Sequence, residues 1–382
     1  MSASAPSIVA PDLAPLAEAA DDRYGQATQL QLTWWRFRRH RLAVASLVII
    51  ALFYGVAVFA DFLAVSDPQA TDARRSYIPP QPLHILAANG SFLSVSALKG
   101  VRDMRTFKLI YTPDPARQLP VRLFAHGYPY RLFGLLPTDM HLLGLGAGTP
   151  SDGIFLLGTD QLGRDLFSRL MVGTRTSLSI GLAGVSLSLL LGVVLGGISG
   201  FYGGLADIVV QRLIEVVRSI PTIPLWMALA ASLPNTWSVT QVYFAITVII
   251  SLVGWTDLAR VVRGRFLALR EEDFVVAAEL AGASHARIIF RHMLPSFASH
   301  VIAAVSLALP TMIVSETSLS FLGLGLRPPA ISWGILLQDA QNVQVLANAP
   351  WLLSAAVPVI VVILAFNFLG DGMRDAADPY GV

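Results

Sequence analysis

The 382-residue chain contains no cysteine, so thiol catalysis, thiolate-bound iron–sulfur clusters and disulfide bonds are excluded. Its seven histidines do not follow a metal-binding spacing such as HxxxH or HExxH, and we expect no metal site. The chain also lacks the GxxxxGK[ST] motif, whose backbone amides cradle nucleotide phosphates. It therefore cannot be an ATPase of that kind. No serine–histidine or paired-carboxylate arrangement indicates catalysis, so we expect no catalytic residue.

Charged residues are scarce as well. They make up 14% of the chain, whereas soluble domains are typically about a quarter charged. Hydrophobic residues make up 54%, and the mean hydropathy is +0.61. The net charge of only +2 indicates nothing about partners. A deficit of charge combined with long apolar runs predicts a protein of the lipid bilayer.

Crossing a bilayer as a helix takes about 20 mostly apolar residues. Six segments meet this length, at residues 42–64, 176–199, 207–233, 242–262, 297–319 and 351–369. The third is the least apolar, because it begins with charged residues and contains Pro221 and Pro224. The first is too long and too far along the chain for a secretory signal, so we expect an uncleaved anchor. The pattern predicts an all-α membrane protein with six transmembrane helices.

The basic residues predict the orientation of these helices. Arg36, Arg38, Arg39 and Arg41 precede the first span, and five more arginines lie within residues 263–296. Because short cytoplasmic segments are enriched in arginine and lysine, both regions are expected inside the cell. The predicted organisation is a cytoplasmic segment 1–41, a first transmembrane helix 42–65, an external insertion 66–175, a five-helix core 176–370 with a cytoplasmic loop 263–296, and a cytoplasmic tail 371–382.

The external insertion is expected to be small and β-rich. Residues 106–112 and 121–125 have the composition of short strands, and residues 113–115 and 127–129 carry turn signals. The prolines at 79, 80 and 82 predict an extended segment leading into these strands.

The loop at 263–296 has the features of two short helices. Glu271, Glu272 and Asp273 suit a helix N-terminus, where the helix dipole favours anions. Gly282 can end that helix in a left-handed conformation. Residues 287–293 restart an amphipathic segment, and Pro295 is expected to mark its exit. Taken alone, this pattern favours an ordinary interfacial helix over a device that passes force to a partner.

Five residues of this loop have a spacing that resembles the signature cytoplasmic loop of binding-protein-dependent importer permeases. They are Ala277, Ala278, Gly282, Leu294 and Pro295. Val276 stands where that pattern has Glu, and His292 stands where it has Ile. Residues 157–178, 316–334 and 367–379 resemble the C-type permease subunit of oligopeptide and dipeptide ABC importers. The resemblance is loose over 34–65 and strong over 155–382. The insertion is longer than in most such subunits and resembles a long-loop subgroup.

The resemblance implies the type I ABC importer permease fold and a role in coupling to an ATPase. The residues it assigns to coupling are Glu271, Glu272, Asp273, Ala277, Ala278, Gly282, Ala283, Arg287, His292, Leu294 and Pro295. The implied partners are a second homologous permease, two ATPase subunits that bind ATP and Mg²⁺, an extracytoplasmic substrate-binding protein and membrane lipid, with no nucleic acid. The implied location is the bacterial inner membrane. Half of a pore for di- and oligopeptides is expected, with oligosaccharides as the alternative substrate and a secondary transporter as the alternative class.

Two groups of polar residues are further candidates on the external side. The first lies just before the second span and comprises Gly158, Thr159, Asp160, Gly163, Arg164 and Asp165. It either docks a binding protein or seats the loop on the helices, and Arg164 could pair with Asp165. Glu316, near the outer end of the fifth span, is either a gate or pathway residue or a buried hydrogen-bonding group.

Two further patterns concern the helices themselves. Arg212, Glu215 and Arg218 are spaced three residues apart at the cytoplasmic end of the third span, which predicts two ion pairs on one face. The second span carries glycines at positions 181, 184, 192, 196 and 197, a pattern typical of close helix packing. The packing partner is expected either within this chain or on the second permease.

Overall fold

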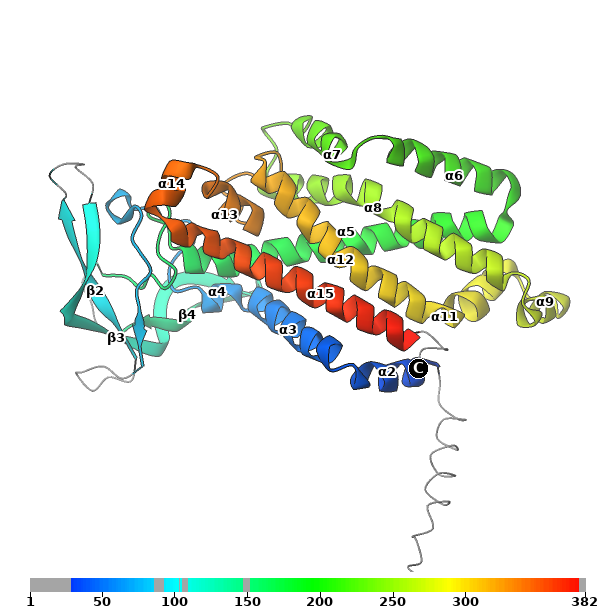
Figure 1. Cartoon of the computed structure of the whole chain (residues 1–382), viewed down its shortest axis with the longest axis horizontal. Helices are drawn as coiled ribbons and strands as arrows, with labels where there is room; N and C mark the ends of the chain where they lie inside the picture. The colour runs from blue at the N-terminus through cyan, green and yellow to red at the C-terminus, as the bar shows by residue number, and fades with distance from the viewer. Residues whose placement is uncertain (1–28, 86–92, 103, 105–108, 147–151, 378–382) are drawn as a thin grey trace, which may run out of the picture.

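The structure is a computed structural model that describes residues 29–85, 93–102, 104, 109–146 and 152–377. Five of its helices are long and apolar enough to cross a membrane, namely α3 (Arg41–Val58), α5 (Leu166–Tyr202), α8 (Val239–Leu269), α12 (Ala298–Phe321) and α15 (Ala356–Ala377) with the preceding turn η3 (Pro350–Ala355). These helices run side by side along the long axis of the molecule (Figure 1). The predicted helical membrane protein is confirmed.

The third predicted span, at 207–233, is not one straight helix. Helices α6 (Gly204–Ser219) and α7 (Thr222–Ala231) cover this region and are bent by 84° relative to each other. Ile220 between them has an extended backbone, with ψ of 131°, because a following proline disfavours the helical conformation. The break falls at the first of the two prolines noted in this span, and the chain has six spans if the bent pair counts as one.

The glycines of α5 are used for packing inside this chain. A Cβ atom on Gly192 would lie 2.7 Å from Cβ of Leu258 in α8, and one on Gly181 would lie 2.8 Å from Ile313 in α12. These approaches let α5 lie against both neighbouring helices, so that the three form the centre of the bundle. Of the two expected partners for the glycine stripe, the structure shows the one within the chain.

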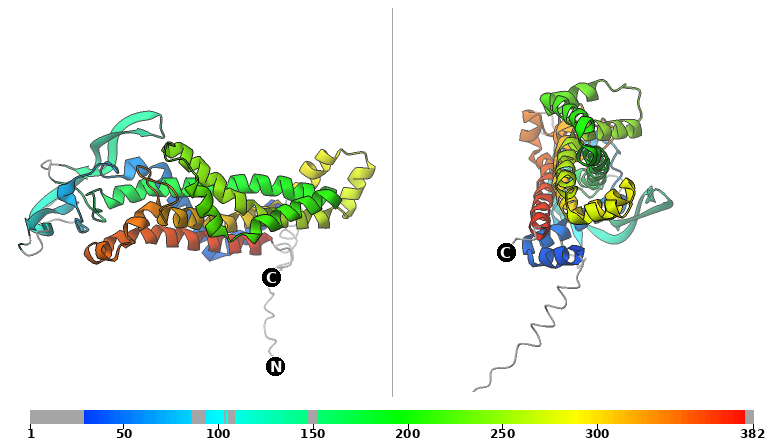
Figure 2. Two further views of the ribbon diagram at one scale, coloured as in Figure 1. Left: turned by 90° about the horizontal axis from the view of Figure 1, so that it is seen from above. Right: turned by 90° about the vertical axis from the view of Figure 1, so that its right-hand side faces the viewer.

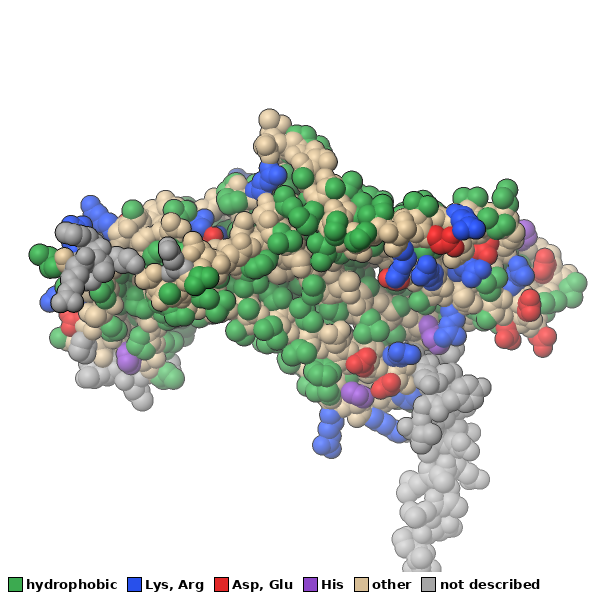
Figure 3. All heavy atoms as spheres, turned by 45° about the horizontal axis from the view of Figure 1, so that its top comes forward, with side chains coloured by type: hydrophobic (Ala, Val, Ile, Leu, Met, Phe, Trp, Pro, Cys, Tyr) green, Lys and Arg blue, Asp and Glu red, His purple; other side chains and the backbone are tan. Residues whose placement is uncertain are grey.

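Helix α3 packs along α15, and its short continuation α4 (Ala60–Leu63) packs against α5 and β4. Before them, α2 (Gln29–Arg39) turns back against the end of α15, where Phe37, Ala43 and Ala376 form a small buried cluster. Figure 2 shows α2 lying across this end of the bundle. Hydrophobic side chains cover much of the middle of the molecule, and charged side chains gather towards the ends of the helices (Figure 3).

A four-stranded antiparallel sheet lies at one end of the bundle, with strand order β1-β2-β3-β4. The strands are β1 (Leu83–His84), β2 (Ser94–Arg102), β3 (Leu109–Leu132) and β4 (Leu136–Leu145). The predicted β-rich insertion is confirmed, but the predicted turns at 113–115 and 127–129 are wrong. Both lie inside the long strand β3, where they coincide with shifts in register against β2 and β4. Bulges of this kind absorb an extra residue without ending a strand. Residues 106–108 of the predicted first strand lie outside the described residues.

The remaining helices are short. On the sheet side lie η1 (Ala73–Arg75), α13 (Trp333–Asp339) and α14 (Val343–Asn348). At the opposite end, α9 (Asp273–Leu280), α10 (His285–Arg287), the π-helical turn η2 (Ile288–Met293) and α11 (Leu294–Ser296) connect α8 to α12. The two ends of the bundle thus carry the two groups of candidate residues.

Candidate functional site

The segment from α9 to α11, which we call the coupling arm, projects beyond the ends of the long helices (Figure 1). Asp273 lies in the first turn of α9, as predicted. At the other end, the Gly282 amide donates to the Glu279 carbonyl at 2.9 Å and the Ala283 amide donates to the Ala278 carbonyl at 3.0 Å. Gly282 has φ of +77°, which completes a Schellman motif. The predicted left-handed end of this helix is confirmed.

The second limb of the coupling arm begins earlier and ends later than predicted. The Ser284 side chain accepts from the Arg287 amide and caps α10, which starts at His285. Pro295 lies inside α11 and does not mark the exit. The break before α12 falls instead at Phe297, because a proline is tolerated in the first turn of a helix, where its missing amide needs no partner.

One face of the coupling arm is firmly packed on the bundle. Val275, Ile288 and Met293 are buried there together with Phe266 of α8 and Phe297. The rings of Phe266 and Phe297 meet edge to face, with centroids 5.5 Å apart. The arm is therefore joined to α8 and to the start of α12 through closely packed side chains, which resist compression.

The coupling arm also leaves several large apolar side chains exposed among its charged residues. Leu280 is 85% exposed and Phe290 is 68% exposed, and Phe274 and Val276 are also exposed. Exposed large apolar side chains in one short segment are typical of a site where another protein binds. The expected coupling residues differ in exposure. Glu271, Glu272, Asp273, Ala277, Gly282, Arg287 and Pro295 are exposed, whereas Ala278, Ala283, His292 and Leu294 are half-buried.

The exposed apolar residues of the arm were missed from the sequence. Their signal was available, because Phe274 and Leu280 interrupt the polar face that an ordinary surface helix would present. The arm also contacts the end of α5, where the His285 ring packs against Phe201 at 5.3 Å and Tyr202 at 6.0 Å between centroids.

The polar contacts near the coupling arm differ from those predicted. Arg212 pairs with Glu215 at 2.6 Å, as expected, and this pair is largely exposed. The predicted pair of Glu215 with Arg218 is wrong, because the Arg218 guanidinium is bound by Asp257 of the neighbouring helix α8.

A further ion pair in this region was missed. Arg263 of α8 donates two hydrogen bonds of 2.6 Å to the carboxylate of Asp207 at the start of α6. The Ser199 hydroxyl of α5 donates to the same carboxylate. The ends of three helices are thus joined at one acidic side chain.

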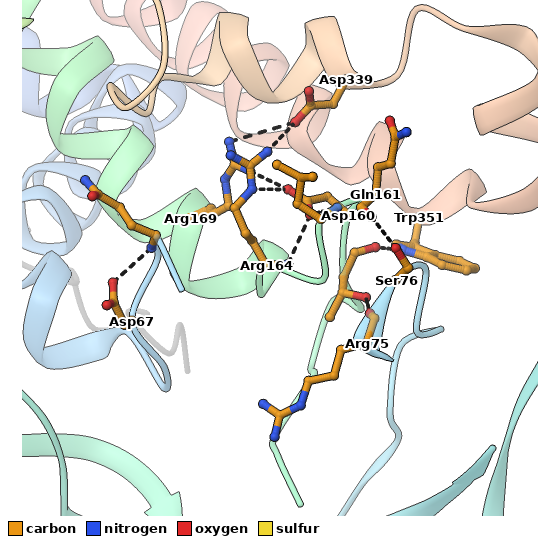
Figure 4. A network of polar contacts seen from close by, with 12 residues as sticks. Asp67, Arg75, Ser76, Asp160, Gln161, Arg164, Arg169, Asp339 and Trp351 are labelled. Carbon is orange, nitrogen blue, oxygen red and sulfur yellow. Dashed lines mark hydrogen bonds and ion pairs between the residues drawn. The ribbon is translucent and has the colours of Figure 1, made fainter. Parts of the chain in front are cut away.

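At the other end of the bundle, two of the expected docking residues, Asp160 and Arg164, form an ion network with Arg169 and Asp339 (Figure 4). We call this network the hub. The Asp160 carboxylate accepts from Arg164 Nε at 2.6 Å and from Arg169 Nη1. Asp339 of α13 lies 3.6 Å from Arg164 and 3.8 Å from Arg169. Burial raises the pKa of the Asp339 carboxyl, and the charge of Arg169 acts in the opposite direction.

Asp165 does not pair with Arg164, so that prediction is wrong. Its carboxylate instead accepts from the Ser168 amide at 2.8 Å and caps the first turn of α5. Arg164 turns to Asp160 because the tight loop between them brings both groups to the interior. Burial raises the pKa of Asp165 to about 6, and the hydrogen bonds from Ser168 oppose this shift.

The loop that carries Asp160 and Arg164 contains two glycines with positive φ, +78° at Gly158 and +74° at Gly163. A Cβ on Gly158 would lie 2.6 Å from the Ile78 carbonyl oxygen. Thr159 accepts a hydrogen bond from the Ile78 amide at 2.8 Å, and its carbonyl accepts from Trp351 Nε1 at 3.0 Å. The loop thus joins the segment before the sheet to the start of α5 and to η3. This geometry favours the seating role, and docking by these residues remains a prediction.

Glu316 is fully buried in α12. Its carboxylate accepts from the Ser177 hydroxyl at 3.0 Å and from the Ser320 hydroxyl at 2.8 Å. The Trp333 amide donates to the same Ser177 hydroxyl at 3.1 Å. Of the two interpretations of Glu316, the structure matches the buried hydrogen-bonding group. Within residues 29–377, as far as they are described, no group of three His, Asp or Glu side chains could hold a metal ion.

Comparison with known proteins gives two family matches. Residues 192–380 match the binding-protein-dependent transport system inner membrane component, and residues 28–80 match the N-terminal transmembrane domain of oligopeptide transport permease C. The oligopeptide transport system permease protein OppC of Bacillus subtilis is 37% identical over 62% of this chain and 75% of its own length. The dipeptide transport system permease protein DppC of Alkalihalophilus pseudofirmus is 38% identical over 58% of this chain and 71% of its own length.

A solved structure of the methionine ABC transporter MetNI in inward-facing conformations is also similar, with 18% identity and a TM-score of 0.44. It aligns with 55% of this chain and 96% of its own. The sequence relatives carry the assignment, because they exceed a third in identity and are covered over most of their length. The chain belongs to the family of binding-protein-dependent transport system inner membrane components and is of the oligopeptide-permease C type.

Proposed function

We propose that this protein is one of two membrane-spanning permease subunits of an ATP-driven importer in the bacterial inner membrane. It forms half of the translocation pore, and a second homologous permease forms the other half. The coupling arm, the N-terminus and the C-terminus lie in the cytoplasm, and the sheet lies outside. The arginines before α3 and in the coupling arm support this orientation.

The observation that carries the proposal is the group of exposed apolar side chains on the coupling arm. Leu280 and Phe274 sit in a groove of a partner ATPase, and the small residue Ala277 lets the two surfaces approach closely. When two ATPases close on ATP, the arm moves, and the packed contact of Phe266 with Phe297 passes the motion to α8 and α12. ATP and Mg²⁺ are bound by the ATPases, and this chain catalyses no reaction.

The substrates are di- and oligopeptides. Relatives named for oligopeptide and dipeptide transport support this class. A substrate-binding protein delivers the peptide to the outer face formed by residues 66–175 and 320–350. Oligosaccharides are the competing class, and uptake of labelled dipeptide against labelled trisaccharide by the reconstituted complex distinguishes the two.

The test is co-purification of the tagged protein from its own membranes in mild detergent. We expect two ATPases and a second permease to accompany the wild type. Leu280→Glu places a charge in the groove contact and reduces recovery of the ATPases at least about tenfold, while the second permease stays bound. Val343→Glu is the matched control, because Val343 is 79% exposed at the opposite end of the bundle.

A substitution at Leu280 tests the groove contact more specifically than a substitution at Gly282 does. Any larger residue at Gly282 strains the left-handed backbone, so its effect would mix a local distortion with the loss of a contact. The proposal is wrong if the wild type purifies without ATPases and still moves solute across liposomes without ATP. That result would make the protein a secondary transporter.

A further inference from the structure

A cavity of about 1500 Å³ lies between the sheet and the helical body, next to the hub. Pockets for small ligands usually measure about 300–1,000 Å³, so this one has room for an extended ligand. The face of β2 and β3 forms one wall, through Leu98, Gly100, Arg102 and Tyr111. Segment 72–79, Phe155 and Trp351 form the facing wall (Figure 4 shows part of it).

The cavity has an unbalanced positive charge. Of its four arginines, Arg75 pairs with Asp72 at 3.2 Å and Arg117 pairs with Asp152 at 2.7 Å. The guanidinium groups of Arg74 on η1 and Arg102 at the end of β2 have no carboxylate partner among the residues that the structure describes. The two come from opposite walls, and both are exposed. An anion between them would be held by charge-assisted hydrogen bonds.

The rest of the cavity is aromatic and apolar. Tyr77, Tyr111, Phe155 and Trp351 line it, and the Arg75 guanidinium lies over the Phe155 ring at 5.6 Å from its centre. The Tyr111 hydroxyl donates to the Arg74 carbonyl and so fixes η1 against the sheet. A Cβ atom on Gly100 would lie 2.8 Å from Leu109, so there is no room for a side chain at this position of the sheet wall.

The outer edge of β2, the strand that carries Leu98, Gly100 and Arg102 of the cavity wall, is largely unpaired in the described part of the sheet. Strand β1 pairs with β2 only at Ser94 and Val95. Over residues 97–102 no other described strand pairs with β2 on the side away from β3. Backbone amides and carbonyls on such an edge can bind an extended peptide as an added strand.

We infer that this cavity binds the C-terminal part of a peptide, with the free carboxylate held between Arg74 and Arg102 and apolar side chains against the aromatic wall. The inference deepens the proposed function, because it assigns the insertion a subsite for the transported peptide outside the membrane. A neutral oligosaccharide would leave both guanidinium groups without an anion, so the charge favours a peptide acid. Carboxylate capture together with an open strand edge is a recurring mode of peptide recognition.

The experiment measures binding of radiolabelled tri-leucine to the purified full-length chain in detergent without ATP. We expect the free acid to bind at least about tenfold more tightly than the C-terminal amide, which corresponds to one charge-assisted contact. The double variant with Arg74→Ala and Arg102→Ala should bind the free acid about tenfold more weakly than the wild type does. Its affinity for the amide should stay almost unchanged. Arg131→Ala is the control, because Arg131 is an exposed arginine of β3 that does not line the cavity.

Equal binding of acid and amide would overturn the inference, and so would binding that the double variant leaves unchanged. A double variant that loses affinity only for the purified substrate-binding protein would also overturn it, because the surface would then be a protein docking site. The outcome is separable from that of the proposed function. Arginine-dependent peptide binding can be found without associated ATPases, and ATP-driven uptake can be found without peptide binding at the cavity.

Discussion

The two ends of the bundle use charged and apolar side chains in opposite ways. In the hub the charges are inside, where Asp160 and Arg169 are almost completely buried and paired. In the coupling arm the charges face water and apolar side chains such as Leu280 are bare. Buried and satisfied polar groups stabilise the chain's own fold, whereas exposed apolar groups are stabilised only when a partner covers them. We therefore interpret the hub as a structural joint and propose the coupling arm as the surface that a partner covers.

The largest expected effect tests the hub. Asp160→Ala leaves the buried Arg169 guanidinium without its closest partner, since Asp339 lies 3.8 Å away and is partly exposed. Removing one partner of a buried ion pair typically destabilises by about 3–5 kcal/mol. We expect a loss of this size in the free energy of unfolding, measured by thermal or denaturant unfolding of the purified protein in detergent.

The matched control is Asp139→Ala in the sheet. Asp139 accepts from His126 at 2.9 Å, but both side chains are largely exposed, so its removal should not measurably change stability. If both variants unfold like the wild type, the hub is not a structural joint, and its residues become candidates for docking a binding protein.

The next effect is a pH dependence at Asp165. Burial raises the pKa of this carboxyl from 3.8 in the unfolded chain to about 6. The folded state therefore holds the proton more tightly than the unfolded state does. The stability contributed by Asp165 is fully present below about pH 4, decreases as the pH rises towards 6, and stays low above it.

Asp165→Asn removes the titrating carboxyl, so the variant does not lose stability as the pH rises from 4 to 6. It keeps the helix cap, because asparagine is as good an N-cap residue as aspartate. Relative to the wild type, the variant should gain roughly 2–3 kcal/mol between pH 4 and pH 7, measured as unfolding free energies across that range. Asp67→Asn, which changes an exposed carboxylate, controls for the loss of one negative charge. A variant that gains nothing at pH 7 would mean that the carboxylate is better solvated than its burial indicates.

The same comparison explains which features the sequence alone could predict. The end of α9 depends on local rules, because Gly282 closes a turn whose partners lie within five residues, and it was predicted correctly. The hub depends on two arginines that lie between Asp160 and Asp339, and only the folded chain brings these two aspartates to the same arginines. Arg169 and Asp339 were therefore missed. The long strand β3 was missed for a similar reason. Its prolines read as turns locally, but pairing with β2 and β4 on either side of the bulges overrides that preference.

The smallest expected effect concerns the exposed ion pair near the coupling arm. Arg212 and Glu215 lie 2.6 Å apart, the same separation as Arg164 and Asp160 in the hub, but their side chains are 76% and 55% exposed. Solvent screening and side-chain entropy leave such pairs worth below about 1 kcal/mol. Arg212→Ala should therefore unfold almost like the wild type. Because equal distances would then give very different stabilities, burial and not geometry would set the strength of these pairs. A loss as large as that of Asp160→Ala would instead show that solvent exposure does not set the strength of these pairs.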